Sequence, residues 1–204
     1  MALQAILWDF GGVLTSSPFE AFNAFEEERG LPRDFIRTLN TANPETNAWA
    51  RFESSAIGAD EFDALFHQES GGRVRGREVI GLLYGRLRPR MVSALDALKA
   101  AGLRHGCITN TVACDRPHAG DLANVFARFD HVIESSKVGL RKPDPRIYAL
   151  MCEALDVEPR ACLFLDDLGV NLKPARAMGM ATIKVLTEDQ ALADLAAATG
   201  VALA

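Results

Sequence analysis

The sequence predicts an α/β protein in which a doubly wound parallel sheet carries a helical insertion after its first strand. Two observations indicate the sheet: apolar runs of strand length recur along the chain, and segments with helical periodicity separate them. A third observation indicates the insertion. After the first apolar run, roughly seventy residues contain amphipathic helices and no convincing strand, which is far more than a strand-to-helix connection needs.

The length of 204 residues is sufficient for one compact core with a small appended module. Hydrophobic residues make up 49% and charged residues 24% of the chain, which is typical of a globular protein and excludes a disordered or fibrous one. The 27 acidic residues outnumber the 22 basic ones, and the formal net charge of −5 argues against binding to a nucleic-acid backbone. We therefore expect no nucleic-acid partner.

Five short apolar runs have the length of buried strands in a parallel sheet that is covered on both faces. The expected strands are residues 3–8, 105–108, 131–133, 161–165 and 181–186. In such a sheet the carboxyl ends of the strands meet at one edge, and ligands bind beyond that edge.

Helices between these strands carry recognisable start and stop signals. One begins at Pro89 and ends before Gly102. Another has Asp144 as its N-cap and Pro145 at its first helical position. The alanine-rich residues 190–204 predict a weak terminal helix.

The insertion after the first strand predicts a run of amphipathic helices. They cover residues 18–28, 32–39, 45–52, 61–68 and 77–83, with a turn at 71–76. An insertion of this size implies a small subdomain that lies over the end of the first strand. We therefore expect an α/β core of residues 1–15 and 89–204 and a helical subdomain of residues 16–88.

Polar side chains follow the expected strands at the carboxyl edge of the sheet. The set comprises Asp9, Thr109, Asn110, Lys142, Asp166, Asp167 and Asn171. Each alone has an ordinary explanation: Asp9 can form a turn, Asp166 can cap the next helix, and Lys142 can be a solvated loop residue. Their joint placement at one edge favours a functional site.

Four motifs, in this order, resemble those of the haloacid dehalogenase (HAD) superfamily: ILWDFGGVL, CITN, KPDPRIY and FLDDLGVNLKPARAMGM. The last two are especially similar to the subfamily IA-like group that includes the N-terminal phosphatase domain of mammalian epoxide hydrolase. The resemblance covers nearly the whole chain. It implies a Rossmann-like core with an inserted helical cap of the C1 type, so that residues 16–88 would form the cap.

The resemblance implies a hydrolase that takes the phosphoryl group of a small phosphorylated metabolite onto Asp9. Mg²⁺ would be held by Asp9, the backbone carbonyl of Gly11 and Asp167, with Asp166 and Asn171 arranging these ligands. Thr109, Asn110 and Lys142 would bind the phosphoryl oxygens. Lys142 would also keep Asp9 ionised.

A count of charges supports the metal independently of the resemblance. The three Asp carboxylates at the sheet edge contribute −3 and Lys142 contributes +1, so the pocket would repel a phosphate without a further cation. One Mg²⁺ would bring the protein's own site to zero charge. Ligands that are all oxygen also favour Mg²⁺ over zinc or copper.

Gly11 departs from the pattern of the superfamily's phosphatases, in which a second Asp at this position acts as general acid and base. Because a positioned acid–base contributes about 10² to 10⁴-fold in rate, we expect turnover that is slow or limited to good leaving groups. His67 and Glu69 in the cap are candidates for a substitute acid–base.

Two alternatives to a phosphatase stay open at this point. A 2-haloacid dehalogenase needs no acid, because halide leaves unprotonated, but dehalogenases resemble Ser-Ser-Asn at the fourth motif and bind no metal, unlike the Asp166–Asp167 pair. A protein that retains the fold and binds phosphate or another ligand without turnover is the second alternative. The sequence does not identify the substrate, and both a monomer and a homodimer are compatible with it.

Location and the remaining candidate groups complete the expectations. The first residues, MALQAILWDFGG, contain no basic leader, and Asp9 interrupts the apolar run, so we expect a cytoplasmic protein without a membrane partner. The spacing of the four cysteines matches no zinc or redox motif, so we expect buried thiols. They are Cys107, Cys114, Cys152 and Cys162. Structural roles are expected for His105, His118 and His131.

Overall fold

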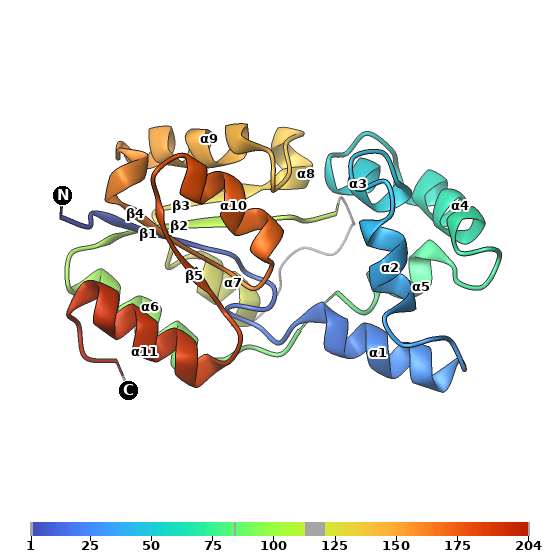
Figure 1. Ribbon diagram of the computed structural model, residues 1–204, viewed down its shortest axis with the longest axis horizontal. Helices are drawn as coiled ribbons and strands as arrows, with labels where there is room; N and C mark the ends of the chain where they lie inside the picture. Colours follow the sequence, from blue (N-terminus) through green and yellow to red (C-terminus); the bar gives the residue numbers. More distant parts are fainter. Residues whose placement is uncertain (1, 84, 113–120, 204) are drawn as a thin grey trace.

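A computed structural model describes residues 2–83, 85–112 and 121–203. Five parallel strands form one sheet in the order β3-β2-β1-β4-β5, which confirms the predicted α/β class (Figure 1). The strands are β1 (Ala5–Trp8), β2 (Arg104–Thr109), β3 (His131–Glu134), β4 (Cys162–Asp166) and β5 (Ala181–Lys184). The order changes direction at β1, so the central strand lies where such sheets bind ligands.

Register brings the strand ends together at one edge. Trp8 pairs with Leu165 of β4 and with Cys107 of β2. The next residue, Asp9, continues the ladder, because its backbone N–H donates to the Leu165 carbonyl at 2.9 Å. Asp9 and Asp166 therefore leave adjacent strands at the same level.

Helices cover both faces of the sheet, because alternate residues of each strand point to opposite sides. In β1, Ile6 and Trp8 pack in the hydrophobic cluster of α6 and α11, whereas Ala5 and Leu7 pack in the cluster of α9 and α10. Figure 1 shows α9 on one side of the sheet and α6 and α11 on the other. The core helices are α6 (Pro89–Ala100), α7 (Asp121–Phe126), α8 (Ser135–Val138), α9 (Pro145–Leu155), α10 (Gly169–Ala177) and α11 (Glu188–Thr199), with a 3-10 turn at Pro159–Ala161.

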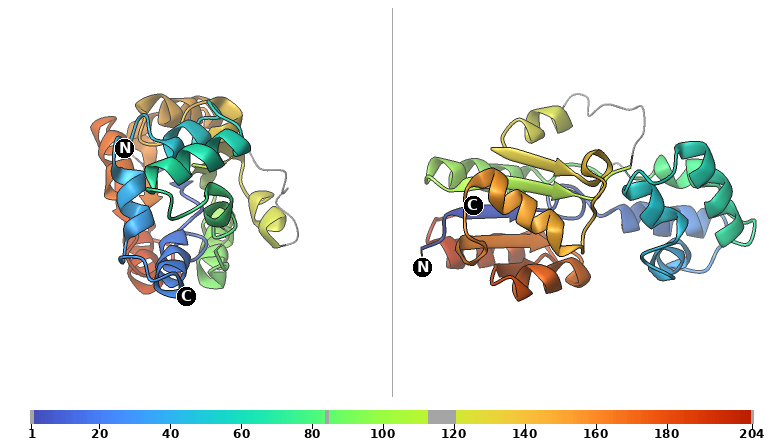
Figure 2. Two further views of the ribbon diagram at one scale, coloured as in Figure 1. Left: turned by 90° about the vertical axis from the view of Figure 1, so that its right-hand side faces the viewer. Right: turned by 90° about the horizontal axis from the view of Figure 1, so that it is seen from above.

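The insertion forms a helical group at one end of the molecule, with a hydrophobic cluster of its own (Figures 1 and 2). Its helices are α1 (Pro18–Glu28), α2 (Phe35–Thr41), α3 (Ala48–Glu53), α4 (Ala59–Glu69) and α5 (Gly76–Ile80). Trp49 lies at its centre, with its ring 5.5 Å from that of Phe62 and 6.1 Å from that of Phe66. Two antiparallel chain segments join this group to the sheet, where Thr15 pairs with Leu87.

Several predicted element ends were wrong for local reasons. The helix predicted from residue 32 begins at Phe35, because Asp34 has a left-handed backbone with φ of 60°. The helix predicted from residue 45 begins at Ala48, because the Asn47 side chain accepts from Ala50 N at 2.8 Å as an N-cap. The strand predicted to residue 186 ends at Lys184, since Leu186 N donates instead to Gln190 Oε1. The short helices α7 and α8 were not predicted.

Most of the described groups that were expected to be structural are buried, and His131 is the exception. His105 is fully buried, and its Nδ1 accepts from Trp8 Nε1 at 2.9 Å. Three free thiols, those of Cys107, Cys152 and Cys162, are buried. Cys114 and His118 lie outside the described residues, and His131 is exposed at the start of β3.

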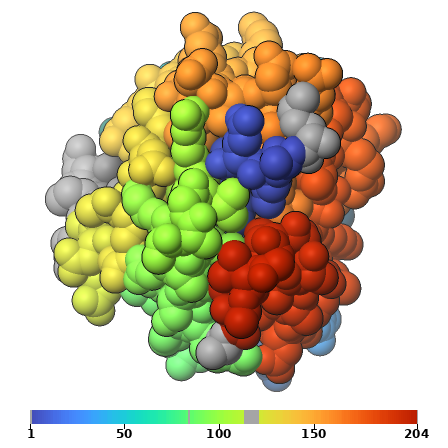
Figure 3. Space-filling view, turned by 90° about the vertical axis from the view of Figure 1, so that its left-hand side faces the viewer, coloured from blue at the N-terminus to red at the C-terminus, as the bar shows by residue number. Residues whose placement is uncertain are grey.

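Figure 3 views the end of the core opposite the cap, where the first residues of the chain lie beside the C-terminal helix. The amino ends of the strands therefore lie away from the edge at which the polar side chains gather. In the part of the chain that the structure describes, no helix combines the length and apolar character needed to cross a membrane.

Candidate active site

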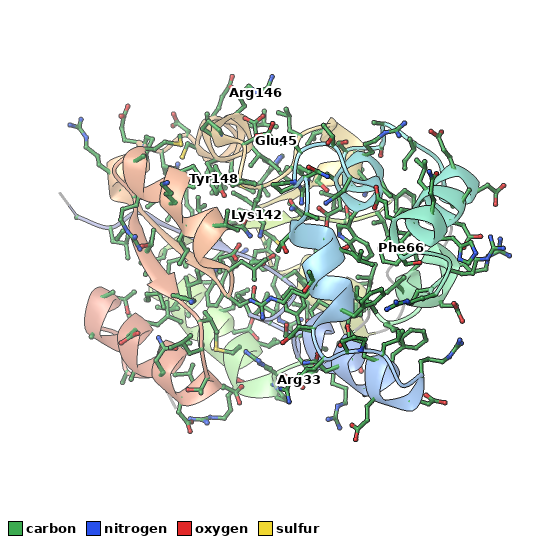
Figure 4. The ribbon with its side chains drawn as sticks, turned by 45° about the vertical axis from the view of Figure 1, so that its right-hand side comes forward. Arg33, Glu45, Phe66, Lys142, Arg146 and Tyr148 are labelled. Atoms are coloured by element: carbon green, nitrogen blue, oxygen red, sulfur yellow. The ribbon has the colours of Figure 1, made fainter. Side chains whose placement is uncertain are left out.

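The predicted site residues meet at the carboxyl edge of the sheet, between the core and the cap. Asp9 follows β1, Thr109 ends β2, Asp166 ends β4, and Lys142 lies in the loop before α9. Figure 4 shows Lys142 and Tyr148 inside the core, whereas Arg146 lies on the outer surface and Phe66 in the cap.

Lys142 is the buried centre of this group. Its side chain is 1% exposed, and its Nζ lies 2.8 Å from Asp9 Oδ1 and 2.7 Å from Asp166 Oδ2. The ammonium also lies 5.6 Å from the centre of the Phe164 ring. Burial opposes the charge, but the attraction of Asp166 and Asp9 outweighs it, so the pKa of Lys142 is raised above its ordinary value. Lys142 therefore stays a cation across the neutral range.

Asp9 presents one carboxylate oxygen to the protein and one to the space beside it. Oδ1 accepts from Phe10 N at 2.7 Å as well as from Lys142. Among the described residues, no hydrogen bond to Oδ2 is found. Burial raises the pKa of Asp9 well above its ordinary value; Lys142 opposes this shift, and the charges of Asp166 and Asp167 add to it.

Asp166 uses both of its oxygens within the protein. Oδ1 accepts from Leu168 N at 2.8 Å and from Asn171 Nδ2 at 3.0 Å, and Oδ2 accepts from Lys142 and from the same amide. Asn171 is held in turn, because the Tyr148 hydroxyl donates to the backbone carbonyl of Asn171 at 2.7 Å. Asp166, itself held by Asn171, therefore fixes the position of the Lys142 ammonium.

Asp167 lies nearer the surface and is less constrained. Its Oδ2 is 3.5 Å from Ser17 Oγ, a contact from the cap that the sequence analysis missed. Burial, followed by repulsion from Asp166, raises the pKa of Asp167 to about 6. The chain passes so close that a Cβ at Gly12, where φ is +77°, would lie 2.3 Å from Asp167 Oδ2. Only glycine fits at position 12.

The donor set fits a divalent cation that prefers oxygen. Carboxylate oxygens of Asp9, Asp166 and Asp167 all lie within 4.8 Å of one another. Because the oxygens of Asp166 are already engaged, Asp9 and Asp167 are the residues with oxygens to spare, and the Gly11 carbonyl accepts no hydrogen bond recorded among the described residues. Burial is the main cause of the raised pKa values of Asp9 and Asp167, and repulsion between the neighbouring carboxylates adds to it.

Thr109 and Asn110 lie at the carboxyl end of β2. Thr109 is 6% exposed at the end of β2. Asn110 is tied to the backbone of Lys142 in both directions: Oδ1 accepts from Lys142 N at 2.8 Å, and Nδ2 donates to Lys142 O at 3.0 Å. The same Nδ2 lies 3.3 Å from Glu53 Oε2 of the cap. Asn110 thus positions the loop of Lys142, which sequence reasoning did not foresee.

The backbone at Gly11 could accommodate a residue with a side chain. Its backbone lies outside the left-handed region, and an added Cβ would meet only Pro18 Cδ, at 3.9 Å. The absence of a carboxylate at position 11 is therefore not imposed by the backbone, in contrast to glycine at position 12.

The two candidates for a substitute acid–base are not brought to the site, so that suggestion was wrong. His67 Nδ1 lies 3.3 Å from the Val74 carbonyl, and Glu69 Oε1 accepts from Ala48 N at 2.8 Å. Both contacts lie within the cap, and Figure 1 places α4 at the end of the cap remote from the sheet.

Sequence reasoning also missed residues that contact the site from a distance along the chain. Glu53 contacts Arg141, which directly precedes Lys142. Ser17 contacts Asp167. Neither pair has a local sequence signal, because 88 residues separate Glu53 from Arg141 and 150 separate Ser17 from Asp167.

A family model described as a haloacid dehalogenase-like hydrolase matches residues 3–179. Bifunctional epoxide hydrolase 2 of Sus scrofa is 33% identical over 221 residues, covering 100% of this chain and 40% of that protein. The chain thus spans about two fifths of the length of the mammalian epoxide hydrolases it matches. A phosphatase of Mycobacterium tuberculosis is 31% identical, with coverage of 88% of this chain and 86% of its own.

Among solved structures, a HAD family enzyme from Bacteroides thetaiotaomicron in complex with magnesium and inorganic phosphate has a TM-score of 0.60 to this chain. The two share 18% sequence identity, over 89% of this chain and 93% of the other. At this level of identity the likeness shows a common fold.

Proposed function

The chain belongs to the family of haloacid dehalogenase-like hydrolases, and from this premise we propose that it hydrolyses a small phosphomonoester in a Mg²⁺-dependent reaction with Asp9 as the nucleophile. The observation that carries the proposal is the buried ion pair of Lys142 with Asp9 and Asp166, beside the more exposed Asp167. This arrangement holds one carboxylate for attack and a second beside it for a cation.

Asp9 has the geometry of a fixed nucleophile. Lys142 and Phe10 N hold Oδ1, which leaves Oδ2 as the oxygen that would attack phosphorus. Attack forms an Oδ2–P bond and breaks the bond from phosphorus to the ester oxygen, which leaves with the electron pair. Water then attacks the same phosphorus and breaks the bond to Oδ2, which restores the carboxylate. The phosphate keeps the oxygen and one proton of the water, and the second proton neutralises the ester oxygen that left.

The proposed cation balances the charge of the site. The three carboxylates and Lys142 sum to −2, which would repel a phosphate dianion. When bound, Mg²⁺ supplies the missing positive charge, held by Asp9, Asp167 and the Gly11 carbonyl. The complex of a fold relative with magnesium and inorganic phosphate supports this assignment.

We assign the phosphoryl oxygens to Lys142, Thr109 and the backbone N–H of Asn110, which lie at the same edge of the sheet; the Asn110 carboxamide is bound to Lys142 and Glu53. Asp166 and Asn171 keep Lys142 in place. Position 11 provides no carboxylate to protonate a leaving group, so we expect aryl phosphates and other esters with good leaving groups to react faster than alkyl phosphates.

We also propose that the two parts of the chain have different roles. Residues 1–15 and 89–204 provide the catalytic core, and residues 16–88 cover the site and select the substrate. The separate hydrophobic cluster of the helices α1–α5 supports this division. So does the contact of Ser17 with Asp167, which lies where the cap meets the core.

Release of nitrophenol from p-nitrophenyl phosphate tests the function. We expect hydrolysis that requires Mg²⁺, stops with a chelator and is lost in Asp9→Asn. Asp96→Asn is the matched control, because Asp96 is exposed on α6 and pairs with Arg128 at 3.0 Å. No release above that of Asp9→Asn, over a range of metals and pH, would overturn the proposal.

Two other results would point to the alternative functions. Chloride release from a 2-haloacid without added metal would identify a dehalogenase. A rise in melting temperature with beryllium trifluoride and Mg²⁺, without turnover of any phosphate ester, would identify a binding protein.

A further inference from the structure

Glu53, the last residue of α3, directs a buried carboxylate out of the cap and into the core. The residue is 8% exposed. Its Oε1 accepts from Trp49 Nε1 at 2.9 Å, within the same helix. Its Oε2 accepts from Arg141 Nε at 2.8 Å, lies 2.7 Å from Arg141 Nη2, and is 3.3 Å from Asn110 Nδ2. One oxygen is thus held by the cap and the other by the core.

The backbone at the end of α3 is joined to the core as well. The Glu53 carbonyl accepts from Ser135 Oγ at 2.7 Å, and Ser135 Oγ accepts from Thr111 N at 2.9 Å. Ser135 is fully buried, and nearby Ser55 Oγ donates to the Ser136 carbonyl at 2.7 Å. The end of α3 is therefore tied to the chain segments that follow β2 and β3.

The carboxamide of Asn110 makes three hydrogen-bonding contacts, each with a defined partner. Oδ1 and one N–H of Nδ2 bind the backbone of Lys142, and the second N–H faces Glu53. A carboxylate accepts and cannot donate, so Glu53 favours the amide orientation in which Nδ2 faces the cap. That orientation is also the one in which Oδ1 accepts from Lys142 N.

Arg141 extends the same control to the loop of Lys142. Its guanidinium binds Glu53 through two nitrogens and donates from Nη1 to the Pro44 carbonyl at 2.9 Å. Both nitrogens converge on the single oxygen Oε2, and hydrogen bonds between two charged groups are stronger than those between neutral ones. Because Arg141 directly precedes Lys142, a fixed Arg141 side chain limits where the Lys142 backbone can lie.

We propose that Glu53 is a positioning residue of the reaction: from the cap, it orients Asn110 and, through Arg141, the loop that carries Lys142. The inference rests on the proposed function, since Asn110 and Lys142 are there assigned to the phosphoryl group. If the inference is correct, the groups that bind the phosphoryl oxygens reach their final positions only when the cap contacts the core. The pairing of Glu53 with Arg141 leaves the net charge of the catalytic site unchanged.

Glu53→Gln tests the inference, with Glu61→Gln as the matched control. Glu61 is also a cap glutamate paired with an arginine, Arg51, at 2.9 Å, but its side chain is 54% exposed. For Glu53→Gln we expect kcat for p-nitrophenyl phosphate to fall about tenfold or more with little change in KM. The affinity for beryllium trifluoride with Mg²⁺, measured by calorimetry, should fall in parallel. Glu61→Gln should change neither quantity.

A double-mutant cycle separates positioning from a merely structural role. If Glu53 acts through Asn110, then Asn110→Ala lowers the affinity for beryllium trifluoride in the wild type but adds little to the loss in Glu53→Gln. Losses that multiply would overturn the inference. If Glu53→Gln does not fold, Arg141→Lys is tested instead, because this change keeps the positive charge and removes the contact through two nitrogens. Unchanged kcat and unchanged affinity for beryllium trifluoride in Arg141→Lys would then overturn the inference.

The controls distinguish this inference from the function on which it rests. A wild-type protein that hydrolyses the ester or binds the analogue, with Glu53→Gln equal to it, overturns the inference alone. A wild-type protein that neither hydrolyses the ester nor binds the analogue overturns the proposed function, and the inference falls with it.

Discussion

Asp9 and Lys142 form an ion pair that is buried at the carboxyl edge of the sheet, with 2.8 Å between Oδ1 and Nζ. The same ammonium lies 2.7 Å from Asp166 Oδ2. One cation therefore compensates two carboxylates, and a third carboxylate, Asp167, is close enough to repel them. The stability of the fold and the chemistry of the site are coupled through this cluster.

Lys142→Met is expected to abolish hydrolysis and to destabilise the protein. The change leaves Asp9 and Asp166 buried without a partner, for which a cost of about 3–5 kcal/mol in the free energy of unfolding is typical. Urea denaturation at neutral pH measures the loss. Mg²⁺ should recover part of it, because a cation beside Asp9 replaces part of the missing charge. Equal stability of Lys142→Met and the wild type, without metal, would contradict the ion pair's role.

Asp167→Asn is expected to stabilise the metal-free protein while it removes the response to Mg²⁺. Burial, with repulsion from Asp166 added to it, raises the pKa of Asp167 to about 6, above the reference value of 3.8, so the charged form opposes folding at neutral pH. Removal of this charge should raise the free energy of unfolding on the order of 1–3 kcal/mol at low salt.

Thermal melting of Asp167→Asn and the wild type, each with and without Mg²⁺, measures both effects. Asp96→Asn is again the control, because Asp96 is exposed and remote from the cluster. A wild type that Mg²⁺ does not stabilise, or an Asn variant that Mg²⁺ stabilises equally, would contradict a metal site at Asp167.

Gly11→Asp is expected to raise the rate of hydrolysis of alkyl phosphates about tenfold or more, because it supplies a carboxyl group beside the nucleophile. The backbone accepts the change, since an added Cβ would meet only Pro18 Cδ, at 3.9 Å. Gly12→Ala is the contrasting variant. Its Cβ would lie 2.3 Å from Asp167 Oδ2, so it should lower stability and weaken the response to Mg²⁺. A folded Gly11→Asp with no gain in kcat would show that another defect limits turnover.

His105 is expected to make the protein less stable in mild acid. Burial lowers the pKa of His105 to about 4 from a reference value of 6.5, so the unfolded chain binds the proton first as pH falls. Stability from the neutral ring is therefore fully present above pH 6.5 and is lost as the pH falls towards 4, by on the order of 3 kcal/mol.

His105→Gln should remove this slope, as measured by the free energy of unfolding between the two pH values. His131→Gln, at an exposed position, should retain it. The free energy of unfolding of the variant is compared with that of the wild type at each pH. The raised pKa of Asp167 gives a dependence of stability on pH with the opposite sign, but this contribution is common to both proteins and cancels. Parallel profiles for wild type and His105→Gln would contradict the prediction.

Local patterns in the sequence were sufficient for the five strands, for most of the helices and for the edge at which the site lies, although not for every element end or for the short helices α7 and α8. Pro145 begins α9 with Asp144 as its N-cap, as predicted, because capping involves residues only two or three positions apart. Asp9, Thr109 and Asp166 meet because parallel strands bring their carboxyl ends to one edge whatever the details of packing. For the same reason the chain's fold class followed from the alternation of apolar runs and helical segments.

Only the tertiary structure decided how these residues share their bonds. Both oxygens of Asp166 accept hydrogen bonds within the protein, from Lys142, Leu168 and Asn171. His67 and Glu69 lie away from the sheet. Glu53 of the cap contacts Asn110 and Arg141 of the core. Helical and strand patterns depend on neighbours a few residues apart, whereas these contacts join residues far apart in the chain. Such contacts depend on the side chains that fill the space between core and cap, and a linear sequence does not display that packing.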